Sequence, residues 1–200
     1  INDMFDDSKD ILVRENVAET ERTMYLTTDG NLYLYYESGG MIEQSAEKDI
    51  LIDTDVAHIS DRTYLKKDGT VWLIDIDNDQ NITKHKKIAE NAQSVASGDS
   101  YYCSVGYISN DGELFYCYNA HDEEEDFVKI ADSAKKVKVS SGSINMLDEH
   151  DTLYLIDVNE GVPGEAVHIM DDVLDFEIGC RLVVTRDGKL WNVSITDGEV

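Results

Sequence analysis

Residues 62–75, RTYLKKDGTVWLID, carry the pattern that decides the fold. Two short runs rich in Thr, Tyr, Val, Trp and Ile flank the dipeptide Asp68-Gly69. Asp-Gly tolerates the positive φ angles of a tight hairpin turn, and β-branched and aromatic residues favour strands. The stretch therefore predicts a strand, a tight turn and a second strand.

The same pattern occurs five times in the chain. Three further copies carry Asp-Gly, whereas the copy at 144–157 has His150-Asp151, which predicts a looser turn. An aliphatic residue stands three positions before the turn residue in every copy. An aromatic residue stands four positions after it, and we interpret this residue as packing between neighbouring repeats. The copies are TMYLTTDGNLYLYY (23–36), RTYLKKDGTVWLID (62–75), VGYISNDGELFYCY (105–118), INMLDEHDTLYLID (144–157) and RLVVTRDGKLWNVS (181–194); their aromatic residues are Tyr33, Trp72, Phe115, Tyr154 and Trp191.

Two more strand candidates precede each hairpin. One is an apolar run, as at 49–52 and 166–170, and the other is a short strand entered from a polar loop. The second element lies in the segments 6–14, 52–60, 89–97, 131–139 and 170–178. Four strands per repeat of roughly forty residues are typical of a β-propeller blade.

The repeat count predicts a closed ring. The turns lie at 29, 68, 111, 150 and 187, and the 42 residues from 187 through the C-terminus and on to 29 match one repeat. The opening residues INDMFDD resemble the outer strand and loop of the other repeats. We therefore expect residues 1–200 to form one all-β domain, a propeller of five four-stranded blades in which the N-terminal strand completes the last blade. A segment of a larger ring is the alternative.

The repeat VKVSSGSINMLDEHDTLYLIDVN (137–159) resembles the blades of the regulator of chromosome condensation family, and the similarity runs through all five repeats. The chain lacks that family's Gly after the aromatic residue, its His in the second strand and its Gly-Gln-Leu-Gly loop. The best-known member has seven blades and is a nucleotide exchange factor for a small GTPase. The resemblance implies a propeller architecture, and it does not imply nucleotide-exchange activity.

Charge narrows the classes of partner. Forty-two acidic residues against 17 basic ones give a formal net charge of −25. Such a surface repels nucleic acid and anionic lipid, and it steers basic proteins or cations towards itself. We therefore expect no nucleic-acid or membrane partner, and no run of apolar residues is long enough for a transmembrane helix.

Two acidic loops are the candidate partner-binding residues. The first follows Trp72 and contains Asp75, Asp77 and Asp79, and the second is an unbroken acidic run in the next repeat: Asp122, Glu123, Glu124, Glu125 and Asp126. The first loop begins like a calcium loop, but Gln80 and Lys86 stand where such a loop needs Gly and Glu. No metal site or cofactor is predicted, and solvated loops are the alternative interpretation of both runs.

No catalytic constellation is visible. The five histidines share no repeat position, and the chain has no nucleophile elbow, phosphate-binding Gly loop or HExxH run. We expect a non-catalytic protein-binding propeller that engages a basic partner, such as an immunity protein or an inhibitor of a basic toxin or nuclease. A carbohydrate-binding, lectin-like propeller and an acidic domain without a specific partner are the alternatives.

Three cysteines, Cys103, Cys117 and Cys180, show no metal-like spacing and form an odd set. We interpret them as reduced thiols of the core. We expect a monomer in the cytoplasm, and a removed export signal stays open as an alternative because the chain begins with Ile1.

Overall fold

A computed structural model describes residues 14–35, 49–79, 81–98, 102–140 and 142–194. These residues form five antiparallel sheets, each of which we call a blade. Blade 1 contains β1 (Val17–Glu21), β2 (Met24–Thr27), β3 (Leu32–Leu34) and β4 (Ile50–Asp53); blade 2 contains β5 (Val56–Ser60), β6 (Thr63–Lys66), β7 (Val71–Ile76) and β8 (Ile82–Ala89); blade 3 contains β9 (Ala92–Ser97), β10 (Val105–Ser109), β11 (Leu114–Cys117) and β12 (Val128–Ala131). Blade 4 contains β13 (Lys136–Val139), β14 (Ser143–Leu147), β15 (Leu153–Asn159) and β16 (Val162–Met170); blade 5 contains β17 (Val173–Phe176), the 3-10 helix η2 (Ile178–Cys180), β18 (Leu182–Thr185) and β19 (Leu190–Asn192).

The strands of each blade are paired in chain order, so every blade is a simple meander. The central hairpin of each blade is the repeated segment identified in the sequence: Tyr64 lies opposite Trp72 in blade 2, for example. The all-β propeller fold is confirmed. The segment 6–14 was assigned to the first strand of blade 1, but that strand is β1 at Val17–Glu21.

The hairpin turns have the predicted chemistry. Gly30, Gly69, Gly112 and Gly188 all have φ between 82° and 93°, a region open to Gly because it has no Cβ. The prediction of a looser turn at 150–151 was wrong. Asp151 adopts φ 67° in place of Gly, and its N–H donates to the Asp148 carbonyl at 3.2 Å, as the turn glycines do in the other blades.

The core lies between the blades. Four clusters of buried apolar side chains each join two consecutive blades, from blades 1 and 2 to blades 4 and 5. Tyr33, Trp72 and Phe115 stack on an aromatic ring across their own hairpin, with ring centroids 5.0–6.4 Å apart. Trp72 and Tyr154 also pack against the clusters between blades 1 and 2 and between blades 3 and 4, as predicted for the repeated aromatic residues. The buried positions of the clusters themselves are mainly aliphatic.

The three cysteines are free and buried, as predicted. Burial raises the pKa of Cys103 to about 12 and that of Cys180 to about 11, so both remain protonated thiols near neutral pH.

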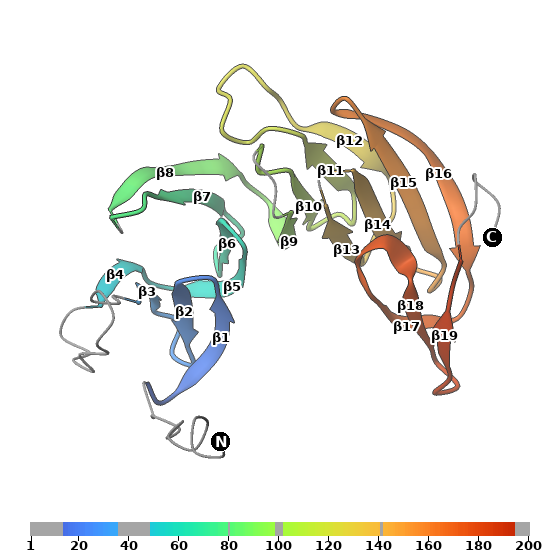
Figure 1. The fold of residues 1–200 in the computed structure, drawn as a ribbon, viewed down its shortest axis with the longest axis horizontal. Coiled ribbons are helices and arrows are strands. Elements are labelled where there is room, and N and C mark those ends of the chain that lie inside the picture. Colours follow the sequence, from blue (N-terminus) through green and yellow to red (C-terminus); the bar gives the residue numbers. More distant parts are fainter. Residues whose placement is uncertain (1–13, 36–48, 80, 99–101, 141, 195–200) are drawn as a thin grey trace, which may run out of the picture.

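The five blades follow one another along an open arc, with blade 1 and blade 5 at its two ends (Figure 1). The described residues therefore do not form the closed ring that the repeat count predicted. A repeat count sets the number of blades, but the angle between blades, which decides closure, depends on side-chain packing at each interface. The strand assigned to residues 1–7 lies outside the described residues, and blade 5 has three strands within them. No helix in the described ranges is long and apolar enough to span a membrane.

Candidate functional site

The first acidic loop is the turn between β7 and β8, and its backbone is held by one of its own carboxylates. Asp77 Oδ1 accepts hydrogen bonds from the backbone N–H groups of Asp79 (2.9 Å) and Asn81 (2.8 Å). These bonds lower the pKa of Asp77, that to Asn81 most. Asp77 and Asp79 are exposed. The turn therefore presents Asp77 and Asp79 to solvent, with Asp77 anchored to backbone N–H groups.

The second acidic loop joins β11 to β12. Asp122 Oδ1 accepts a hydrogen bond from the N–H of Glu124 at 3.0 Å, and Asn119 Oδ1 accepts one from the N–H of His121 at 3.3 Å. Asp122, Glu123, Glu124 and Asp126 are exposed, and Glu125 is half-buried. A cavity of about 310 Å³ lies beside this loop and is lined by Lys86 and Lys87 of blade 2 together with four of the five acidic residues, all but Glu124.

The structure joins the second loop to strands β7 and β8 of blade 2, and it places Asp75 in β7 and not in the turn that follows. His121 Nδ1 lies 2.9 Å from Asp75 Oδ2, and Lys84 Nζ donates to the His121 carbonyl at 2.5 Å. Arg62 Nη1 contacts the other oxygen of Asp75 at 3.3 Å. Asp75 therefore ties the second loop to β7, and it is the least accessible to a partner of the three predicted aspartates.

Burial lowers the pKa of His121, with Asp75 acting in the opposite direction. Between the folded-state pKa and the ordinary value of about 6.5, the unfolded chain binds more protons than the folded one. The stability that neutral His121 contributes is therefore present above the ordinary pKa and is lost as pH falls through the lowered folded-state value.

We expect His121→Gln to lose less stability on acidification than the wild-type chain does. Urea unfolding at about pH 7 and about pH 5 measures the change for each protein, and the general charge of the chain affects both alike. Equal losses in the two proteins would show that His121 does not titrate as described.

These described acidic side chains do not form a metal site. The described residues contain no group of three or more His, Cys, Asp or Glu side chains that could hold a metal ion. The oxygens of Asp75 and Asp77 are directed to Arg62, His121 and backbone N–H groups instead.

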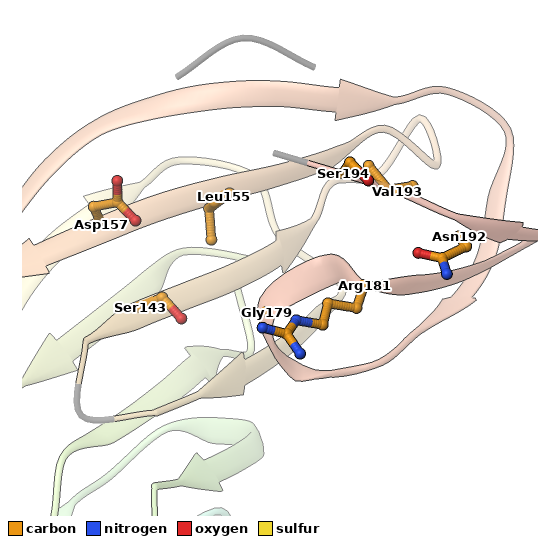
Figure 2. Close-up of a pocket in the computed structure, with 8 residues that line it drawn as sticks. All are labelled: Ser143, Leu155, Asp157, Gly179, Arg181, Asn192, Val193 and Ser194. Atoms are coloured by element: carbon orange, nitrogen blue, oxygen red, sulfur yellow. The ribbon is translucent and has the colours of Figure 1, made fainter. Parts of the chain in front are cut away.

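Figure 2 shows a further cavity, of about 580 Å³, between blades 4 and 5. Its lining includes Asp157, Arg181 and Asn192, and it lacks an aromatic side chain. A third cavity, of about 490 Å³, lies where the second acidic loop meets β7 and β8 and is lined by Arg62 and Tyr102 among others. A lectin-like propeller presents equivalent pockets in successive blades, whereas these three cavities in the described residues have different linings.

The architecture resembles solved structures. Human WBSCR16 superposes with a TM-score of 0.56 at 11% identity, over 84% of this chain and 58% of that one. Two structures of Saccharomyces cerevisiae RCC1 (Prp20), one of them bound to Kap60, match with TM-scores of 0.45 and 0.46 at 13% and 14% identity, over 69% of this chain and 42% and 43% of theirs. The chain has the fold of an RCC1-like β-propeller. This chain spans less than two thirds of the length of each of these three neighbours.

The likeness of this RCC1-like propeller to its neighbours concerns the fold alone, because the sequence identities are low. No family model matches the sequence, and no curated protein matches it.

The acidic residues were predictable from the sequence, but the side chains that contact them across the blade interface were not. Arg62, Lys84 and His121 lie in two different repeats and at positions without a repeated pattern. Only the docking of blade 2 on blade 3 makes them neighbours, so the sequence offered no signal for this junction.

Proposed function

We propose that this RCC1-like propeller is a non-catalytic protein-binding module whose acidic surface engages a basic protein. In its most concrete form, it is an immunity protein or inhibitor that neutralises a basic toxin or nuclease. The net charge of −25 and the acidic loops of the adjoining blades 2 and 3 carry this proposal.

The hydrogen bonds and contacts that hold the acidic side chains support the proposal. The loops are held by hydrogen bonds of Asp77 and Asp122 to backbone N–H groups and by contacts of His121 with Asp75 and Lys84. A loop that is already ordered loses less conformational entropy when a partner binds. Carboxylates held on a protein surface can occupy a basic site that otherwise holds phosphate groups.

Four of the predicted residues form the proposed contact. Asp122, Glu123, Glu124 and Asp126 are exposed, and they carry four negative charges within five consecutive positions. Charges of this kind accelerate association with a basic partner, and salt screens the effect.

Because the thiols are free and buried, a reducing compartment such as the cytoplasm is part of the same proposal.

The test begins with affinity capture at low salt, after which the captured basic protein is purified and its binding measured with pure components. We expect the quadruple variant Asp122→Asn, Glu123→Gln, Glu124→Gln, Asp126→Asn to weaken binding by about 10- to 100-fold, since each surface charge pair contributes about 0.2–1 kcal/mol. Asn at 122 retains the oxygen that accepts the hydrogen bond from Glu124, so the loop can keep its shape.

The matched control removes four exposed charges elsewhere on the surface. The changes are Glu15→Gln, Asp111→Asn, Glu149→Gln and Glu165→Gln. We expect these changes to weaken binding by less than about threefold, because they alter the long-range field and no contact. Equal losses of affinity in both variants would show that the acidic loop acts only through the net charge of the chain. Binding that is insensitive to salt would refute an electrostatic partner site.

A further inference from the structure

The last blade has an uncovered apolar face. We call this surface the end face; it consists of Leu182, Val184, Leu190 and Asn192, which lie on one side of the paired strands β18 and β19. Leu190 is 66% exposed, although the residues at the same repeat position in the other four blades are fully buried. Those residues are Leu32, Val71, Leu114 and Leu153. Leu182 is 41% exposed, whereas its equivalent in blade 4, Asn145, is buried.

The backbone shows the same difference. The carbonyl at the turn of each of the first four blades accepts a hydrogen bond from an N–H at or just before the start of the next blade. These bonds are Gly30 to Val56 (2.9 Å), Gly69 to Ala92 (2.9 Å), Gly112 to Ala134 (2.7 Å) and Asp151 to Val173 (2.9 Å). In the described part of the chain, no following blade supplies this bond to Gly188, and a Cβ added there would meet no atom within 4 Å. The end face is therefore built as a blade interface, and none of the five described blades lies on it.

We propose that a second copy of this chain covers the end face, so that two blades 5 pack against each other about a two-fold axis. Apolar side chains this exposed mark an interaction surface when they adjoin one another. A two-fold interface uses the same patch on both subunits, and an aliphatic patch is complementary to itself. A two-fold dimer of this kind replaces the monomer that we expected from the sequence.

Charge favours blade 5 as the place where two copies meet. Residues 173–194 contain three acidic and three basic side chains, namely Asp175, Glu177, Asp187, Arg181, Arg186 and Lys189. Blade 5 therefore has no net charge, although the chain carries −25. Like-charged molecules approach most easily where their local charge is neutral, because repulsion between distant charges is screened over about 8–10 Å.

The other end of the arc does not match the end face. The residue that a preceding blade would cover is Ile59, Val95, Val137 and Phe176 in blades 2 to 5, and all four are buried. In blade 1 the equivalent residue is Thr20, which is exposed and lies between Glu19 and Glu21. Head-to-tail docking of blade 5 on blade 1 would place polar Thr20 against the leucines of the end face; the neighbouring Glu19 points the other way and bonds His58 and the Ile59 N–H of blade 2. The face-to-face arrangement buries apolar surface from both copies instead.

Sedimentation velocity and light scattering on the purified 200-residue chain at micromolar concentrations test the proposal. We expect a dimer that persists in high salt, which separates it from the salt-sensitive binding of a basic partner. Leu190→Glu is expected to weaken the dimer at least about tenfold, because it places two buried carboxylates at the interface. Val162→Glu is the control: Val162 is 68% exposed but lies in blade 4, away from the end face, so the dimer should remain.

A second variant reports the symmetry of the contact. Leu190→Cys is expected to give a disulfide-linked dimer on mild oxidation, since equivalent residues lie close together near a two-fold axis. A wild-type chain that stays monomeric throughout the micromolar range would overturn the proposal and leave the end face to a different sheet-bearing chain. Growth beyond the dimer would indicate head-to-tail docking and would overturn it as well.

Discussion

Leu153→Ala is expected to lower the free energy of unfolding by about 2–5 kcal/mol, the usual cost of removing a fully buried leucine from a packed core. Leu153 has no exposed surface and belongs to the cluster that joins blades 4 and 5. The shortened side chain would leave a cavity beside Val173 and Phe176, which the rigid sheets can fill only in part. Urea unfolding followed by far-UV circular dichroism gives the value.

Leu190→Ala is the matched control, because the same residue type occupies the same repeat position with 66% of its surface exposed. The change should cost less than about 1 kcal/mol, since little apolar surface is returned to water. The measurement requires a protein concentration low enough to exclude association through the end face. A cost at Leu190 comparable to that at Leu153 would mean that blade 5 is covered within the monomer.

Gly98→Ala is expected to destabilise the chain by about 1–3 kcal/mol through overpacking. Gly98 follows β9 of blade 3, and a Cβ there would lie 2.9 Å from Ser140 Cα and 3.1 Å from the Val139 carbonyl oxygen of blade 4. Because these neighbours are backbone atoms, the strain must be relieved by moving one blade away from the other. Thermal and urea unfolding measure the loss.

Gly142→Ala provides the comparison. A Cβ at Gly142 would meet no atom within 4 Å, and its φ lies outside the left-handed region. The change should leave stability within about 0.5 kcal/mol or raise it slightly, because Ala restricts the unfolded chain more than Gly does. A neutral Gly98→Ala would show that blades 3 and 4 are less tightly apposed than the structure describes.

The sequence identified the parts of the fold that depend on local chemistry. Asp29-Gly30 and its counterparts predict hairpins because few residues tolerate the φ angles of such turns, and the residues around them predict strands. The acidic loops were also visible in the sequence, since their charge does not depend on the fold. The turn at His150-Asp151 was misjudged because Asp151 adopts a positive φ that is commoner for Gly.

Only the tertiary structure decided what the repeated positions contact. Leu153 and Leu190 occupy the same place in the same sequence pattern, yet one is buried and the other exposed, because burial depends on whether another blade follows. Ring closure was predicted from the repeat count and is not seen in the described residues, since the angle between blades is set by packing at each interface. The contact of Asp75 with His121 likewise joins residues 46 positions apart, and it exists because blade 2 docks on blade 3. Turns and strands follow from short-range sterics and side-chain alternation, whereas interfaces between blades follow from which surfaces the folded chain brings together.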